Sequence, residues 1–290
     1  MEKFGNCWMV VFEPQTAEDE RLSDFLEYFF EVVCVNYVGD KLQYVGYISK
    51  RLDENHLNEA AKIRNIALPK YEQKFLPAEN WLKKNVIKFP PLETEDFYIY
   101  GTHESVVPEN DKLKLMIYAA TAFGSGQHKT TQLCLKLLAY LYHNGTRVKN
   151  ILDMGCGSGI LALAACKIWD DANALAADID DEAVAVALGN AKNNNLENQI
   201  HVLQSNGFEN SKITESAPYQ LIFANILARP LIDMAANLCN SLEKKGFAIL
   251  SGFIEEQLSW IQNEYELHGM KILKILNDEN WYAILLEKTK

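Results

Sequence analysis

The sequence is short of basic residues. Lys and Arg number 28 against 39 Asp and Glu in 290 residues, which gives a formal net charge of -11. A surface that wraps nucleic-acid phosphates gathers Lys and Arg, so this balance argues against direct nucleic-acid binding. It is compatible with a basic partner, although many enzymes are acidic for solubility alone.

Cysteine pairs and long apolar runs are also missing. The 6 cysteines are scattered and form no Cys-x-x-Cys pair, which indicates neither a zinc ribbon nor a dense disulfide scaffold. No stretch reaches the roughly 18 consecutive apolar residues of a membrane span. Residues 1–14 lack the layout of a secretory signal. We therefore expect a cytoplasmic protein with reduced cysteines and no membrane association.

The N-terminal part predicts a small α+β domain at residues 1–68. Strand-like and helix-like patterns alternate here, with a short hairpin-type turn between the second and third strands. The order strand-helix-strand-strand-helix is typical of a ferredoxin-like sandwich. The expected elements are a strand at 7–13, a helix opened by Thr16, strands at 33–38 and 42–48, and a helix at 53–66.

Prolines cluster in the next segment. Five of the 8 prolines fall within residues 69–109, and Pro90-Pro91 would break any helix begun before them. We interpret 69–109 as a linker; a short strand expected at 97–100 belongs either to this linker or to the next domain.

Residues 110–290 alternate strands and helices. This pattern predicts an α/β domain with a doubly wound, mostly parallel sheet covered on both faces, followed by a closing antiparallel hairpin. The expected strands lie at 113–119, 150–154, 174–179, 200–204, 221–224 and 247–251, with the hairpin at 271–276 and 281–287. The expected helices lie at 130–142, 160–169, 181–193, 230–244 and 255–268.

A glycine-rich turn follows the strand at 150–154. Gly155, Gly157 and Gly159 would let the backbone turn sharply and let a ligand approach where a Cβ would collide. A tight connection with no ligand is the alternative. The spacing puts Ile160 where the dinucleotide fingerprint has its third glycine, so a pyrophosphate cofactor is disfavoured.

Two carboxylates end the next strand, about 20 residues after the glycines, where the ribose diol of a nucleoside cofactor would lie. Asp178 and Asp180 share one face of an extended segment, so periodicity does not choose between them. A helix is expected to begin at Asp181. We therefore interpret Asp180 as its N-cap and Asp178 as the ribose ligand.

Polar residues at two further positions could face the same crevice. Asn225 comes at the carboxyl end of the strand 221–224, beside the glycine turn in any doubly wound sheet. The alternative is an asparagine that stabilises the turn before Pro230. The loop 122–131 holds two glycines and ends in Thr130 and Thr131, which suits either a ligand contact or a plain loop with a threonine helix cap.

Taken together, these segments resemble the PrmA family, bacterial methyltransferases that modify a large-subunit ribosomal protein of the stalk base. The matching segments are AFGSGQHKTT at 122–131, DMGCGSGILA at 153–162, DID at 178–180, ANILARPL at 224–231 and LSG at 250–252. The resemblance covers most of 113–290, while the N-terminal part matches only in layout. Gln127 and Lys129 depart from the family's usual Thr and Pro.

The resemblance implies a class I methyltransferase fold with S-adenosylmethionine as cofactor. It also implies that residues 1–68 recognise the substrate, a basic ribosomal protein methylated on lysine side-chain and/or N-terminal amines. Asn225 would be the catalytic residue. The implied cofactor contacts are Thr131, Gly155, Asp178 and Asn225.

Methyl transfer to an amine depends mainly on positioning, so we expect no obligatory general base. Desolvation would lower the amine pKa, and the Asn225 side chain would align its N–H groups. His128 is the alternative base, although a histidine in such a loop more often hydrogen-bonds or stacks; His103 is a weaker one.

The sequence disfavours three rival functions. A methyltransferase acting on glutamine or a nucleobase nitrogen typically carries Asn-Pro-Pro, whereas here Ile226-Leu227-Ala228 follows Asn225. A nicotinamide-dependent oxidoreductase is opposed by the glycine spacing and the terminal hairpin. A non-catalytic binding module is opposed by the joint presence of the glycines, Asp178 and Asn225.

Overall fold

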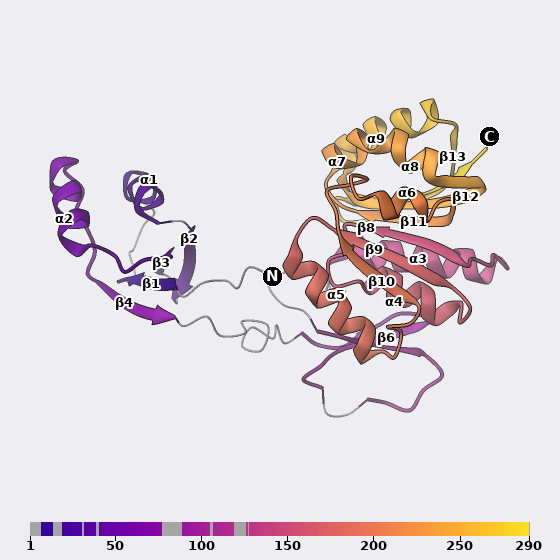
Figure 1. The fold of residues 1–290 in the computed structure, drawn as a ribbon, viewed down its shortest axis with the longest axis horizontal. Coiled ribbons are helices and arrows are strands. Elements are labelled where there is room, and N and C mark those ends of the chain that lie inside the picture. The colour runs from indigo at the N-terminus through magenta and orange to yellow at the C-terminus, as the bar shows by residue number, and fades with distance from the viewer. Residues whose placement is uncertain are drawn as a thin grey trace. The chain divides into compact units, whose positions relative to one another are not determined.

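The computed structural model describes residues 7–13, 19–30, 32–38, 41–76, 89–104, 107–118, 126 and 128–289. The chain divides into two compact units, Met1–Lys84 and Asn85–Lys290 (Figure 1). Within the described residues, no helix combines the length and the apolar character needed to cross a membrane.

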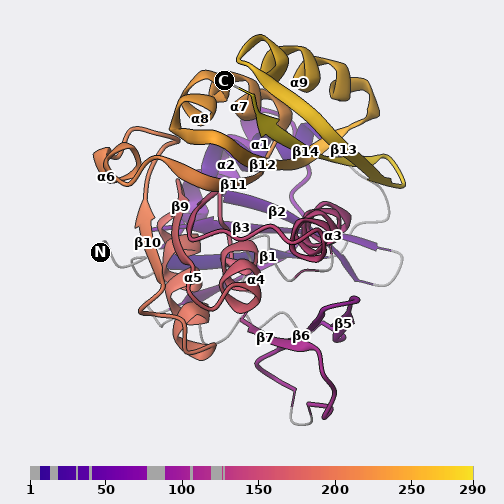
Figure 2. The ribbon, with the colours of Figure 1, turned by 90° about the vertical axis from the view of Figure 1, so that its right-hand side faces the viewer.

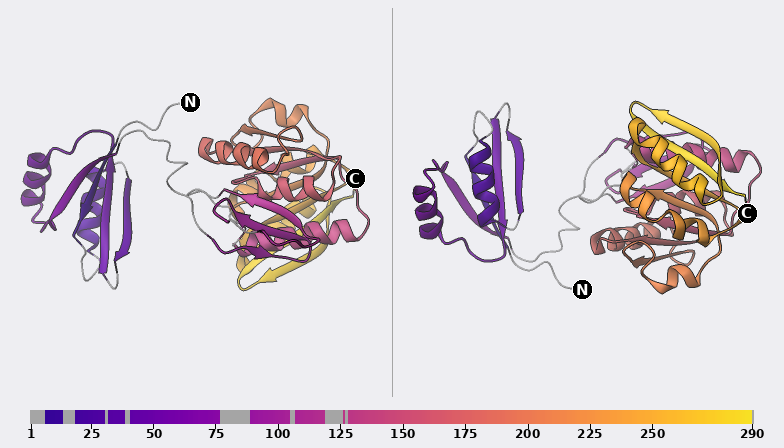
Figure 3. Two further views of the ribbon diagram at one scale, coloured as in Figure 1. Left: turned by 90° about the horizontal axis from the view of Figure 1, so that it is seen from below. Right: turned by 90° about the horizontal axis from the view of Figure 1, so that it is seen from above.

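The N-terminal unit is a four-stranded antiparallel sheet with strand order β2-β3-β1-β4. Both of its helices pack on one face of this sheet (Figure 3), where Phe12 and Tyr44 from the strands meet Phe25 and Leu57 from the helices. The elements are β1 (Cys7–Phe12), α1 (Glu20–Phe29), β2 (Val32–Val38), β3 (Lys41–Ile48), α2 (Glu54–Ile63) and β4 (Tyr71–Leu76).

Helix α1 begins later than the sequence pattern predicts. Asp19 is its N-cap, because the Asp19 carboxylate accepts a hydrogen bond of 3.1 Å from the backbone N–H of Leu22. Thr16, which we expected to open this helix, lies outside the described residues. The cap of α2 follows the same rule, since Asp53 accepts from the N–H groups of Asn55 and His56.

The expected linker at 69–109 contains strands of both units. At its start, β4 pairs along its length with β1 and so completes the N-terminal sheet. Toward its end, β5 (Leu92–Glu93) and β6 (Phe97–Gly101) belong to the C-terminal unit. Residues 77–88 lie outside the described residues.

The C-terminal unit is built on a seven-stranded sheet with order β10-β9-β8-β11-β12-β14-β13. The first five strands are parallel, and β14 runs antiparallel to both β12 and β13. The mostly parallel sheet with a closing hairpin, expected from the alternating pattern, is confirmed. The strands are β8 (Asn150–Met154), β9 (Asn173–Asp178), β10 (Ile200–Gln204), β11 (Tyr219–Asn225), β12 (Leu242–Ile254), β13 (Met270–Asp278) and β14 (Trp281–Lys288).

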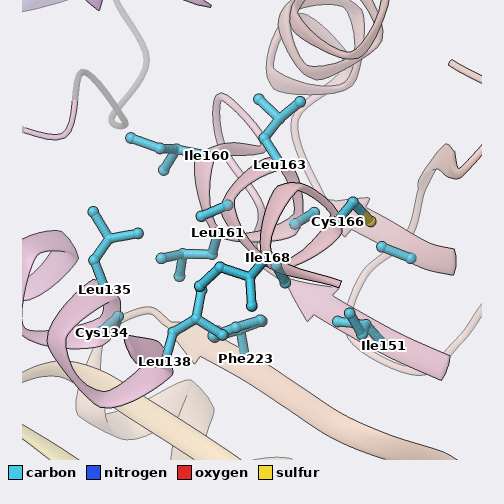
Figure 4. Close-up of a cluster of buried hydrophobic side chains, with 14 of the residues drawn as sticks. Cys134, Leu135, Leu138, Ile151, Ile160, Leu161, Leu163, Cys166, Ile168 and Phe223 are labelled. Atoms are coloured by element: carbon cyan, nitrogen blue, oxygen red, sulfur yellow. The ribbon is translucent and has the colours of Figure 1, made fainter. Parts of the chain in front are cut away.

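Helices cover both faces of this sheet (Figure 2). Ile151 and Phe223 face one side, where they pack against α3 and α4 (Figure 4). Their strand neighbours Leu152 and Ile222 face the other side, toward α7, α8 and α9. The helices are α3 (Lys129–His143), α4 (Ile160–Ile168), α5 (Asp181–Asn193), α6 (Ser211–Glu215), α7 (Ala228–Asp233), α8 (Ala235–Ser241) and α9 (Glu255–Leu267).

A separate three-stranded sheet, β5-β6-β7, corrects one expectation. We predicted the strand at 113–119 as a lead-in to the large sheet, but β7 (Leu113–Ile117) pairs in parallel with β6 instead. Its buried Leu115 and Ile117 join the same cluster as α3 and α4. Helix α4 therefore lies between two sheets, which explains why all of its residues except Lys167 are apolar and buried.

The single helix expected at 230–244 is two short helices followed by a strand. Helix α7 ends at Asp233, α8 runs from Ala235 to Ser241, and β12 already begins at Leu242. Lys244, where we expected this helix to end, lies in the first part of a 13-residue strand.

Candidate functional site

The glycine turn between β8 and α4 requires glycine for two physical reasons. Gly155, Gly157 and Gly159 all have positive φ angles, of 69°, 53° and 77°. Residues with a Cβ adopt this region at a cost. In addition, a Cβ on Gly155 would lie 2.2 Å from Cγ2 of Ile226, closer than any real contact. The turn is therefore a close approach between the ends of β8 and β11.

Ile226 is enclosed from the other side by the end of β12. A Cβ on Gly252, whose φ is 96°, would lie 2.1 Å from the carbonyl oxygen of Ile226. The N–H of Ile226 donates a hydrogen bond of 3.1 Å to the Ser251 carbonyl. The chain just after Asn225 is thus held between two glycine positions, which accounts for the LSG segment at 250–252.

Asp178 lies at the end of β9 and faces the glycine turn. Its Oδ2 accepts a hydrogen bond of 2.8 Å from the N–H of Gly157, and its Oδ1 accepts one of 3.1 Å from the N–H of Asp180. An ionised carboxylate has about four acceptor positions. Each oxygen therefore keeps capacity for one ligand hydroxyl, as a ribose diol requires.

Asp180 caps helix α5, as the sequence predicts. Its side chain accepts a hydrogen bond of 2.9 Å from the N–H of Glu182. The two neighbouring carboxylates therefore have different tasks, since only Asp178 contacts the glycine turn.

Asn225 and Thr131 meet at the same edge of the sheet. The Asn225 Nδ2 donates to the Thr131 Oγ1 across 3.3 Å, and Thr131 is buried at the first turn of α3. Within the described residues, no hydrogen bond joins the Asn225 side chain to the turn before Pro230, which was the alternative role. With Nδ2 directed at Thr131, Oδ1 is the atom that presents an acceptor.

His128, and not a threonine, is the N-cap of α3. Its Nδ1 lies 3.4 Å from the N–H nitrogen of Thr130 and 2.7 Å from the Thr130 hydroxyl oxygen. The imidazole packs edge-on against Trp281, with 4.9 Å between ring centroids. Of the two expected roles, base or hydrogen-bonding and stacking residue, the geometry matches the second.

The hairpin β13–β14 supports the start of α3 in a way that sequence reasoning missed. Besides the His128–Trp281 contact, the Lys129 ammonium lies 3.2 Å from the Asp278 carboxylate and 3.8 Å from Glu279. Lys129 is one of the positions that depart from the family pattern. The other histidine considered, His103, lies after β6 with its Nε2 3.2 Å from the Phe89 carbonyl.

Asp153 is a buried carboxyl beneath the glycine turn to which we had assigned no role. It is 1% exposed, and its Oδ2 accepts a hydrogen bond of 3.0 Å from the N–H of Ala162. Burial raises the pKa of Asp153 to about 7; the Ala162 bond lowers it and the nearby Asp178 charge raises it. The signal was present in the sequence as a carboxyl that ends an apolar strand.

These features define the class of protein. The strand order, the closing hairpin, the glycine turn after β8 and the carboxylate at the end of β9 are those of a class I, S-adenosylmethionine-dependent methyltransferase.

Nearly the whole chain is similar in sequence to one family of known proteins. Residues 2–289 match the family described as ribosomal protein L11 methyltransferase (PrmA). A ribosomal protein L11 methyltransferase of Bradyrhizobium diazoefficiens is 36% identical over 211 residues, 73% of this chain and 71% of the relative. One from Brucella suis is 31% identical over 281 residues, 95% of this chain and 98% of the relative.

A solved structure shares the fold. The crystal structure of a ribosomal protein L11 methylase from Lactobacillus delbrueckii superposes with a TM-score of 0.62 at 26% identity, covering 70% of this chain and all of that one. The chain belongs to the ribosomal protein L11 methyltransferase (PrmA) family.

Proposed function

We propose that this methyltransferase transfers methyl groups from S-adenosylmethionine to lysine side-chain and/or N-terminal amines of ribosomal protein L11. The observation that carries the proposal is the Asn225–Thr131 pair at the carboxyl end of β11. It presents an amide oxygen beside the glycine turn, and an amine is a donor that such an oxygen can align. The names of the relatives supply the identity of the substrate.

We assign the cofactor to the glycine turn and its neighbours. Three glycines with positive φ form a tight backbone turn that carries no side chain at Gly155, Gly157 or Gly159, which suits a ligand lying against the backbone. The remaining acceptor positions of Asp178 suit the ribose hydroxyls. Thr131 and Asn225 complete the assigned contacts from the opposite side of the crevice.

The chemistry asks the protein mainly for positioning. The bound cofactor supplies an activated methyl group on a sulfonium. The incoming amine must be neutral, and a site that excludes water lowers the pKa of an amine. Asn225 Oδ1 then accepts a hydrogen bond from one N–H group of the amine and so orients the nitrogen lone pair toward the methyl group. Orientation of this kind can supply a large part of an enzyme's rate enhancement. His128 is engaged as a helix cap, so the proposal includes no general base.

The charge of the chain favours a basic protein as the substrate. A net charge of -11 attracts Lys-rich and Arg-rich proteins during encounter and repels nucleic-acid phosphates. We therefore assign the protein itself, and not ribosomal RNA, as the binding partner. The reaction is assigned to the cytoplasm, where ribosomal proteins are made.

We assign substrate recognition to the N-terminal unit. Its two helices occupy one face of the sheet, and no described helix covers the opposite face, where Met9 and Val11 lie. A charged side chain on that face, as in Met9→Lys, is expected to raise KM for the protein substrate. The dissociation constant of the cofactor should not change, and a change in it would argue against this division of labour.

The experiment that tests the proposed function is intact-mass spectrometry of purified ribosomal protein L11 before and after incubation with the enzyme and S-adenosylmethionine. We expect mass increases in whole methyl increments, mapped by peptide analysis to lysines or the amino terminus. The Asn225→Ala enzyme is the matched control and should add methyl groups far more slowly over the same incubation time. Unmodified L11 after incubation with an enzyme shown by calorimetry to bind the cofactor would reject this substrate.

A further inference from the structure

Asn190 on helix α5 is fully buried and uses its side-chain amide in three directions. Its Oδ1 accepts a hydrogen bond of 2.7 Å from the N–H of Tyr118, at the end of β7. Its Nδ2 donates to the carbonyl of the same Tyr118 across 3.0 Å and to the carbonyl of Ser158 across 2.9 Å. One side chain thus joins α5, the end of β7 and the glycine turn.

Asn194, one helical turn later, repeats half of this arrangement. It accepts from the N–H of Met116 at 3.0 Å and donates to the Met116 carbonyl at 2.7 Å. Its second donor goes to the carbonyl of Asn190 within the same helix. The two amides therefore bond alternate residues of β7 along the edge that β6 does not occupy, as a neighbouring strand would.

The bond to Ser158 separates Asn190 from Asn194. Ser158 stands between Gly157, whose N–H donates to Asp178, and Gly159, which begins helix α4 in a left-handed conformation. A hydrogen bond to the Ser158 carbonyl fixes the plane of the Ser158–Gly159 peptide, and the N–H of that same peptide donates across 2.8 Å to the Cys156 carbonyl. The Cys156 carbonyl shares its peptide with the Gly157 N–H, so these two successive hydrogen bonds hold that N–H where it contacts the Asp178 carboxylate.

We infer that Asn190 is a positioning residue for cofactor binding, because its amide orients the Ser158 peptide and so the contact between Gly157 and Asp178. The inference rests on the assignment of the cofactor to this turn. Because Asn190 is fully buried, we assign it no direct contact with the cofactor or the substrate. Its second set of bonds anchors the end of β7, the strand that leads toward the loop 122–131.

The chain offers a matched control for this role. Asn194→Ala removes a buried amide that bonds the same strand from the same helix, but it leaves the Ser158 bond intact. Asn190→Ala removes the bonds to Tyr118 and also the bond to Ser158. We expect the two variants to lose similar thermal stability, since each leaves two backbone groups of β7 without a buried partner.

Calorimetric titration with S-adenosylhomocysteine distinguishes the two variants. Asn190→Ala should raise its dissociation constant about tenfold, whereas Asn194→Ala should stay within about twofold of the wild type. In methylation assays, Asn190→Ala should raise KM for S-adenosylmethionine and leave KM for the protein substrate unchanged. Equal dissociation constants for the two variants would reduce Asn190 to a structural residue and overturn the inference.

Asn190→Asp decides the question if Asn190→Ala does not fold. Aspartate keeps the shape and the acceptor for the Tyr118 N–H, but it lacks the donor to the Ser158 and Tyr118 carbonyls. We expect weaker binding of S-adenosylhomocysteine, and wild-type binding by this variant would also overturn the inference. Asp178→Ala, titrated in parallel, distinguishes a failure of the cofactor assignment from a failure of the role of Asn190. Unchanged binding of S-adenosylhomocysteine by Asp178→Ala would reject the cofactor site itself.

Discussion

Asn225 and Thr131 are 94 positions apart in the chain, yet the Asn225 amide nitrogen lies 3.3 Å from the Thr131 hydroxyl oxygen. The contact arises because β11 ends where α3 begins, at the carboxyl edge of the parallel sheet. The Thr131 hydroxyl holds the amide by its nitrogen, and in the proposed mechanism this leaves Oδ1 to accept from the incoming amine. This pair carries the first prediction.

Asn225→Ala is expected to lower kcat/KM for the protein substrate about a hundredfold, because it removes the acceptor that aligns the amine. Thr131→Val should cost about tenfold, since the amide loses its orientation but not its oxygen. If Thr131 acts through Asn225, the double variant should be little worse than Asn225→Ala alone. Steady-state kinetics of all four enzymes checks this.

Thr130→Val is the control for that cycle. Thr130 is as buried as Thr131 but its hydroxyl lies against His128 and not Asn225. We expect it to cost stability without lowering kcat/KM comparably. Multiplicative losses in the double variant would instead show that Thr131 and Asn225 act independently.

The two carboxylates after β9 should separate in a binding experiment. Asp178→Ala removes the assigned partner of the ribose hydroxyls and should weaken binding of S-adenosylmethionine at least about tenfold by calorimetry. Asp180→Ala removes the N-cap of α5 and should cost about 1 kcal/mol of unfolding free energy with little change in binding. An unchanged dissociation constant for Asp178→Ala would move the ribose contact to another residue.

Some parts of this site could be predicted from the sequence and others could not. The difference lies in whether a contact follows from strand order or joins residues that are far apart in the chain. Asp178 and Asn225 each end an apolar strand, and parallel strands end at one edge, so their proximity is predictable from order alone. The cap of α3 was not predictable in this way. His128 takes that position with its ring against Trp281, a residue near the opposite end of the domain's sequence.

The prediction that β7 belongs with the large sheet was wrong for a similar reason. Its apolar pattern suits any parallel sheet, and nothing local distinguishes the large sheet from the small one. The deciding contacts come from Asn190 and Asn194, whose amides bond to Tyr118 and Met116, 72 and 78 positions away in the chain. A run rich in asparagine at the end of a helix is ordinarily a C-terminal signal, and that is how such residues are interpreted without a structure.

Gly155→Ala should disrupt the glycine turn through two separable effects. The added Cβ would meet Cγ2 of Ile226 at 2.2 Å, and the φ of 69° would still be unfavourable for alanine. We expect a loss of unfolding free energy of about 2 kcal/mol or more and weaker cofactor binding. Chemical denaturation and calorimetry measure the two quantities.

Ile226→Ala in the same chain relieves only the collision. The double variant Gly155→Ala with Ile226→Ala should therefore recover part of the lost cofactor binding, relative to Gly155→Ala alone. Backbone strain should keep it below the wild type, by about 1 kcal/mol. No recovery at all would mean that the positive φ, and not the approach of Ile226, sets the requirement for glycine.

The buried carboxyl of Asp153 gives the chain a pH dependence with a definite sign. Its folded-state pKa is raised from 3.8 to about 7, chiefly by burial. The protonated form is therefore favoured by folding, and this stabilisation is fully present below about pH 4. As the pH rises to about 7, Asp153 ionises in the unfolded chain but stays protonated in the folded chain, so the unfolding free energy falls. The fall is about 1.4 kcal/mol for each pKa unit of the shift, which makes a few kcal/mol in all.

Asp153→Asn isolates this contribution, because asparagine does not ionise and its oxygen still accepts the hydrogen bond from Ala162. Denaturant unfolding at pH values from 4 to 8 should show wild-type stability falling relative to the variant up to about pH 7 and no further divergence above it. Parallel curves would place the folded-state pKa near its ordinary value. A divergence that continues beyond pH 8 would instead mean that Asp153 stays protonated under the conditions of the reaction, as a neutral donor beneath the glycine turn.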